Sequence, residues 1–227
     1  MARVPGLVIT LVMTTITLLH TSPAHVPTFK ALADEIAPHA RLVQIVRQDW
    51  LEQAIEKGVQ PGLRDQIGAT IQEADGKVIC TCTTLGPAAV DAGAIRIDAP
   101  MMQQAARLGG QVLLVYALGS TAGASRGLLE QAFAEIGEPA TITPLYLGAV
   151  WPLFEAGAHA AFAAQIADAG RDKARGQSFA AVVLAQASMA GAALHLQDLD
   201  VPVLTSPRPA LEYCLKRFEL LLDHKNN

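Results

Sequence analysis

Two strand-like segments of the sequence end in side chains that can do chemistry. Val78–Thr81 runs into Cys82–Thr84 and a Gly-Pro turn, whereas Val182–Ala185 runs into Gln186–Ser188. A thiolate acts as a nucleophile or a proton acceptor, and hydroxyl groups donate hydrogen bonds to anions. The position after a strand is where a fold places a reactive group, so both segments are candidate sites. A glutamine stands in the second segment where the first has its thiol.

Strands alternate with helical patterns along the chain, which is typical of a parallel α/β sheet. The predicted strands are 15–19, 42–46, 78–81, 95–97, 112–118, 141–147, 180–185 and 201–204. Helical periodicity favours helices after residue 23 and at 50–56, 63–74, 101–108, 126–136, 154–169 and 209–222, with a charged loop at 171–176.

The landmarks of the first half recur in the second half, which indicates a duplicated unit. A tryptophan follows the second strand of each half, as Trp50 and Trp151, and the fourth strand of each half runs into a proline. The sequence therefore predicts two pseudo-symmetric α/β lobes, each a four-stranded parallel sheet of order 2-1-3-4, with the active site between them. Pro144 lies inside a predicted strand and places that strand at a sheet edge. We expect an extension at 1–13, a first lobe at 14–108, a second at 109–208, and helix 209–222 packed on the first lobe.

The strand order decides which side chains meet. Ligands of doubly wound sheets bind beyond the carboxyl ends of the strands. The first and third strands of each lobe are neighbours in a 2-1-3-4 order. His20 should therefore lie beside Cys82 in the first lobe, and Ser120 and Thr121 beside Gln186 in the second. Such a cleft predicts a small carboxylate held by hydroxyl groups and amides.

Each candidate residue also has a purely structural interpretation. Free cysteines are often core residues, which is how we interpret Cys80 and Cys214, but the position of Cys82 favours a functional thiolate. His20 could tune that thiol or be hydrogen-bonded inside the sheet. The hydroxyl groups could act as helix caps. Large aromatic side chains after strands, such as Trp50 and Trp151, are more often core residues than cleft residues.

The composition excludes several function classes. The 227 residues are 51% hydrophobic and 17% charged with a net charge of −4, which argues against disorder and against nucleic acid as a partner. Three cysteines without a CxxC pair favour a reducing, cytoplasmic compartment. No His/Cys/Asp/Glu spacing predicts a metal site, and no glycine motif predicts a nucleotide cofactor. The apolar run Leu7–Leu19 is too short to span a membrane, although it resembles a signal peptide.

From about residue 13 onward the sequence resembles the aspartate/glutamate racemase superfamily, which includes hydantoin racemases, maleate isomerases and arylmalonate decarboxylases. The resemblance rests on the strand–Cys–Thr–Thr phrase at Cys82, the parallel phrase at Gln186 and the loop Gly119–Thr121. It implies an isomerase that needs no cofactor and acts at the carbon next to a carboxylate, and it implies a homodimer. The resemblance implies Cys82 as a catalytic residue, and the predicted strand order adds His20 as a second candidate. The candidate substrate-binding residues are Thr83, Thr84, Ser120, Thr121, Gln186, Ala187 and Ser188.

One position departs from the superfamily pattern, because Gln186 stands where a second catalytic cysteine is expected. An amide neither takes nor gives a proton near neutral pH. Three mechanisms stay open: Cys82 as the lone acid/base, Cys82 as a nucleophile, or His20 as the missing partner. The alternatives to an isomerase are an arylmalonate-type decarboxylase and a non-catalytic carboxylate-binding protein, either exported or inside the cell. No arginine ends a predicted strand, which disfavours a dicarboxylate, and Arg47 is the nearest candidate to bind one.

Overall fold

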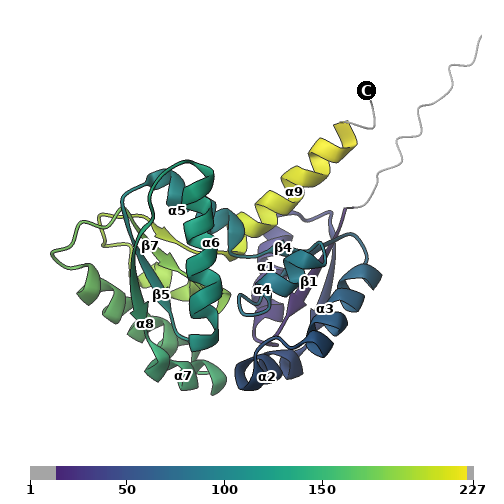
Figure 1. Cartoon of the computed structure of the whole chain (residues 1–227), viewed down its shortest axis with the longest axis horizontal. Helices are drawn as coiled ribbons and strands as arrows, with labels where there is room; N and C mark the ends of the chain where they lie inside the picture. The colour runs from purple at the N-terminus through teal and green to yellow at the C-terminus, as the bar shows by residue number, and fades with distance from the viewer. Residues whose placement is uncertain (1–13, 224–227) are drawn as a thin grey trace, which may run out of the picture.

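The computed structural model describes residues 14–223, so the expected extension at 1–13 lies outside the described residues. Two lobes lie side by side, each built on one sheet (Figure 1). The first half of the chain contains β1 Thr15–His20, α1 His25–Ile36, β2 Arg41–Val46, α2 Gln48–Lys57, α3 Pro61–Glu73, β3 Lys77–Cys80, α4 Gly86–Asp91, β4 Ile95–Arg96 and α5 Ala99–Leu108. The second half contains β5 Gln111–Tyr116, η1 Gly119–Thr121, α6 Ala122–Glu135, β6 Thr141–Tyr146, η2 Gly148–Val150, α7 Trp151–Glu155, α8 His159–Ala174, β7 Ala181–Leu184, η3 Ala187–His195, β8 Val203–Leu204 and α9 Pro207–Asp223.

Both sheets are parallel and have the predicted strand order. They run β2-β1-β3-β4 and β6-β5-β7-β8, so the expectation of two α/β lobes of order 2-1-3-4 is confirmed. The central strands are apolar on both faces, as Ile16, Leu18 and Leu19 of β1 show, because helices cover both sides of each sheet. Pro144 lies in the edge strand β6, where its missing N–H costs no ladder hydrogen bond.

The helix predicted at 154–169 is wrong in its bounds. The segment forms two helices, α7 Trp151–Glu155 and α8 His159–Ala174, separated at Gly157, whose φ of 74° suits glycine. The loop predicted at 171–176 is also wrong, because α8 continues to Ala174. Arg171 stabilises that last turn through ion pairs with Asp168 and Asp198, and cations are favoured at a helix carboxyl end.

Two helices pack on the lobe opposite to the strand they follow. Helix α5 follows β4 of the first sheet, but Met101, Met102 and Ala105 belong to the core of the second lobe. Helix α9 follows β8 of the second sheet, but Leu211 and Cys214 belong to the core of the first lobe. Each lobe is therefore completed by a helix from the other side. Within residues 14–223 no helix has the length and apolarity that a membrane span requires.

Candidate active site

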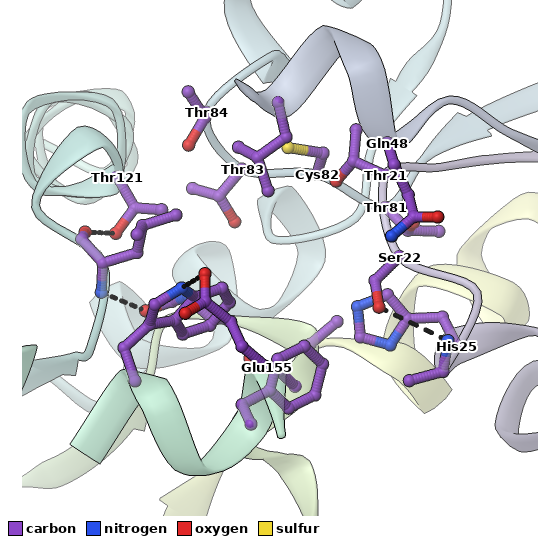
Figure 2. A pocket seen from close by; sticks show the side chains of 18 of the residues that line it. Thr21, Ser22, His25, Gln48, Thr81, Cys82, Thr83, Thr84, Thr121 and Glu155 are labelled. Carbon is purple, nitrogen blue, oxygen red and sulfur yellow. Dashed lines mark hydrogen bonds between the residues drawn. The ribbon is translucent and has the colours of Figure 1, made fainter. Parts of the chain in front are cut away.

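A cavity of about 300 Å³ lies between the lobes, beyond the carboxyl ends of the strands. The loops after β1, β3, β5 and β7 supply its hydroxyl groups, and helices α2 and α7 supply two carboxyl groups of its wall. Figure 2 shows Thr21, Cys82, Thr83, Thr84 and Thr121 around this space. Seven of its lining residues carry hydroxyl groups, beside apolar, glutamate, glutamine and histidine side chains, and no lysine or arginine of the described residues lines it.

Cys82 lies at the centre of these hydroxyl groups. The residue is 8% exposed and lines the cavity, so a small molecule in the cavity could contact it although most of its surface is buried. Burial raises the pKa of the Cys82 thiol, while hydrogen bonds from the Thr21 hydroxyl and from the backbone amides of Leu85 and Thr84 act in the opposite direction. Burial therefore destabilises the Cys82 thiolate, and these hydrogen-bond donors stabilise it.

The other two cysteines are core residues, as the sequence indicated. Cys80 and Cys214 are fully buried, and neither lines the cavity. Burial raises the pKa of both thiols, that of Cys214 to about 11. Cys82 is thus the one cysteine of the described chain at the cavity.

Direct hydrogen bonds connect the loops of the two lobes at this point. Thr83 donates from Oγ1 to the carbonyl oxygen of Ala185 at 3.2 Å, and the hydroxyl groups of Thr84 and Ser120 lie 2.9 Å apart. Thr83 follows Cys82 in the chain and Ala185 precedes Gln186, so these contacts bring the two strand ends together. Ser120 itself does not line the cavity; its hydroxyl positions Thr84.

The remaining predicted binding residues of the second lobe line the cavity. They are Thr121, Gln186, Ala187 and Ser188. Thr121 donates its hydroxyl proton to the carbonyl of Leu118 at 2.7 Å, which closes the turn before α6. The side-chain oxygen of Gln186 accepts the backbone N–H groups of Ala117 and Leu118.

His20 lies behind the cavity wall. It is 0% exposed, with Nδ1 2.8 Å from the Thr81 hydroxyl and Nε2 3.0 Å from Oε1 of Gln44. Burial lowers the pKa of His20, so the neutral ring is favoured. Thr81, and not His20, lines the cavity. This geometry supports a positioning role for His20 rather than contact with a substrate.

A different histidine of the same loop lines the cavity. His25 packs against Phe29 of its own helix and against Phe154 of the second lobe, with ring centroids 6.0 Å apart in each case. Burial, followed by the nearby His20 and His159, lowers the pKa of His25 to about 4. His25 is therefore neutral at physiological pH.

Sequence reasoning did not foresee the outer wall of the cavity. Glu52 of α2 and Glu155 of α7 line it, and Trp151 donates from Nε1 to Glu155 at 2.8 Å. Glu155 is labelled in Figure 2. Trp50, in contrast, is fully buried in the first-lobe core. Arg47 does not line the cavity, because its guanidinium pairs with Asp49. The sequence did contain a sign that these helices border the cavity, because each follows the second strand of its lobe.

No family model and no curated sequence matches the chain, so the comparison rests on structure. Glutamate racemase from Francisella tularensis aligns with a TM-score of 0.66 at 14% identity, over 93% of this chain and 82% of that one. Allantoin racemase from Klebsiella pneumoniae aligns with a TM-score of 0.64 at 21% identity, over 91% and 88%. A variant of arylmalonate decarboxylase aligns with a TM-score of 0.50 at 14% identity, over 89% and 92%.

These solved structures belong to the aspartate/glutamate racemase superfamily, and the chain has their two-lobed α/β fold. The resemblance stated from the sequence is confirmed at the level of the fold. Sequence identities this low support a shared fold and no shared activity, because one fold can host several chemistries and function depends on the site.

Proposed function

We propose that this protein is a cofactor-independent enzyme that acts at the carbon next to a carboxylate, or an equivalent carbonyl group, of a small molecule. The observation that carries the proposal is Cys82: one thiol, held by Thr21 and by backbone amides, at the cavity between the lobes. Hydroxyl groups of both lobes surround the thiol, which suits a bound carboxylate. The racemases of the same fold support an isomerase-type reaction.

The proposed reaction begins with Cys82 as a thiolate. It takes the proton from the carbon next to the carboxylate, and the electron pair of that C–H bond moves into the carboxylate to form an enediolate. Thr84, whose hydroxyl can donate to a ligand while it accepts from Ser120, would bind the carboxylate and its enediolate. Thr83 and Thr121 would shape the cavity wall, because each already donates its one hydroxyl proton to a backbone carbonyl. The Cys82 thiol then returns a proton to the carbon. The chemistry is balanced without an oxidant or a cofactor.

Deuterium exchange tests this proposal whatever the final product of the reaction is. The protein is incubated in D2O with D- or L-glutamate, aspartate, allantoin or mandelate, and NMR follows the signal of the proton next to the carboxyl or carbonyl carbon. We expect exchange with at least one of these compounds. The variant Cys82→Ala should lower its rate by about a hundredfold or more, since general acid–base groups contribute ~10²–10⁴. A matched Cys214→Ala variant should keep the rate, and full activity in Cys82→Ala would refute the proposal.

A decarboxylase is the second candidate, and the glutamine at position 186 favours it. Loss of CO2 from a 2-arylmalonate leaves its electron pair as an enediolate, so only one proton must be supplied. A single thiol suffices for that step, and Cys82 is the one thiol at the cavity. Release of CO2 from phenylmalonate, lost in Cys82→Ala, would identify this reaction. Binding of the acids with neither exchange nor CO2 release would instead indicate a non-catalytic binding protein.

A further inference from the structure

The side-chain amide of Gln186 has a fixed orientation. Its Oε1 accepts the backbone N–H of Ala117 at 2.6 Å and that of Leu118 at 2.9 Å. Only the oxygen of a carboxamide accepts hydrogen bonds, so two N–H donors on one side leave the NH2 group on the other side. The amide is therefore locked by the end of β5, and its two N–H donors are directed away from that backbone.

The NH2 group of Gln186 faces the cavity. The residue is 6% exposed and lines the cavity, and no hydrogen bond of the described residues uses Nε2. Within residues 14–217, the fully enclosed side-chain nitrogen and oxygen atoms without a partner are the hydroxyls of Ser125, Ser188 and Ser206. Because Nε2 is not among these enclosed atoms and has no protein partner, its remaining contact is the cavity.

Ser188, two residues further on, lines the same cavity, but its Oγ is fully enclosed, so this hydroxyl group does not open to the ligand space. The end of β7 thus presents to the cavity the two N–H donors of Gln186, which do not titrate near neutral pH.

These donors lie across the interface from Cys82. The hydrogen bond from Thr83 to the Ala185 carbonyl joins the residue after Cys82 to the residue before Gln186. We propose that Gln186 binds an oxygen of the substrate opposite Cys82, in place of a second acid/base, so that protons enter and leave on the Cys82 face alone. This inference rests on the proposed function and specifies its stereochemistry.

The consequence is exchange without inversion. When Cys82 removes the proton, the electron pair moves onto the substrate oxygen, and the Gln186 NH2 group strengthens its hydrogen bond to that oxygen without giving up a proton. The thiol then returns a proton, or a deuteron in D2O, to the same face. Deuterium should therefore enter one enantiomer much faster than its mirror image appears.

A binding measurement tests the donor role independently of turnover. In 15N-labelled protein, the side-chain NH2 signals of Gln186 are assigned by their absence from Gln186→Glu. We expect them to shift on titration with at least one of glutamate, allantoin, mandelate or phenylmalonate. No shift with any of the four overturns the inference. Cys82-dependent exchange in the same samples then shows whether the proposed function survives without it.

Variants at position 186 test the chemical role. Gln186→Glu keeps an oxygen for Ala117 and Leu118 but replaces the donor by an anion, so we expect exchange slowed by about a hundredfold, as for a lost hydrogen bond to a charged group. The rate is measured well below the melting temperature of the variant, because a buried carboxylate also lowers stability. The exposed Gln53→Glu is the charge-matched control and should keep the rate. A Gln186→Glu rate within twofold of the wild-type rate overturns the donor role.

Gln186→Cys should gain inversion, because a thiol opposite Cys82 can supply a proton to the other face. Chiral chromatography of the exchanged substrate then detects the second enantiomer, which the wild-type protein should form at least tenfold more slowly than it exchanges deuterium. Inversion in the wild type at the rate of exchange would place a second acid/base elsewhere in the cavity and overturn the one-face mechanism.

Discussion

At the scale of single residues, the chemistry depends on how the anion of Cys82 is stabilised. Removing the thiolate from water is unfavourable, which raises the pKa of Cys82, and the Thr21 hydroxyl is the first of the donors that oppose this effect. A raised pKa also makes the thiolate a stronger base. Fewer molecules therefore carry the thiolate at neutral pH, but each thiolate is a stronger base.

The pH dependence of the rate follows from this balance. If Cys82 acts as a base, only the thiolate is active, so the exchange rate rises with pH until the thiol is fully ionised. Thr21→Val removes one donor to the thiolate with little change of shape, and we expect the rate at pH 8 to fall about tenfold or more. The exposed Thr28→Val is the control. A pH–rate profile measured by NMR provides the comparison.

The opposite slope would identify the second candidate function. In a decarboxylation the protonated thiol is the reactive form, because Cys82 supplies the proton. The rate would then fall as pH rises through the pKa of Cys82. A flat profile would contradict the base role, because a base must be deprotonated to act and its rate rises with pH below its pKa.

At the scale of elements, a buried ion pair lies beside the start of α4, the helix that follows the loop of Cys82. Arg96 of β4 is 8% exposed and Asp98, just before α5, is 0% exposed; the two share hydrogen bonds of 2.9 and 2.7 Å. The same guanidinium donates to the carbonyl of Ala124 in α6 at 3.2 Å. A Cβ atom at Gly86, where α4 begins, would lie 2.8 Å from Arg96 Nε. Arg96 thus connects elements of both lobes directly behind the candidate site.

Removal of one partner should therefore be costly. Arg96→Met leaves the Asp98 carboxylate buried and unpaired, and we expect the free energy of unfolding to fall by about 3–5 kcal/mol. The double variant Arg96→Met/Asp98→Leu removes both charges and should recover much of this loss. Chemical denaturation measures both values.

A surface pair supplies the control for this comparison. Lys30→Met breaks the exposed pair with Asp34 on α1 and should cost less than about 1 kcal/mol. An equal loss in Arg96→Met and Lys30→Met would show that the buried pair does not hold these elements together.

At the scale of the whole molecule, the exchanged helices join the lobes. The chain boundary expected at 108/109 separates β4 from β5, yet α5 before it completes the second core and α9 at the far end completes the first. The inner part of α9 lies against the first lobe in Figure 1. Neither half of the chain contains all of the residues that bury its own sheet, so we expect the two lobes to unfold together.

Two tryptophans allow this cooperativity to be measured. Trp50 is buried in the first-lobe core and Trp151 packs against the second, so Trp151→Phe and Trp50→Phe each leave one reporter. Urea denaturation followed by fluorescence should give coincident transitions in the two variants. Adding Leu211→Ala to each variant should lower the free energy of unfolding seen by both reporters by about 2–5 kcal/mol, as expected for a buried leucine. A shift seen by Trp50 alone would mean that the lobes unfold independently.

The sequence by itself determined the α/β class, the order of the strands and the strand ends that carry the site. These features follow from local information: apolar runs mark buried strands, a proline marks an edge strand, and the side chain after a parallel strand faces the ligand edge. Cys82, Gln186 and Ser188 were found in this way. The break between α7 and α8 was missed because alanine-rich helical periodicity continues on both sides of Gly157.

Only the tertiary structure decided which side chains meet. The sequence placed His20 beside Cys82, but its ring lies behind Thr81 and bonds Gln44, because the face on which a strand's last residue packs depends on its neighbours. The exchange of α5 and α9, the contact of Thr83 with Ala185 and the orientation of the Gln186 amide are likewise long-range. They join segments far apart in the chain, and local periodicity contains no information about such contacts.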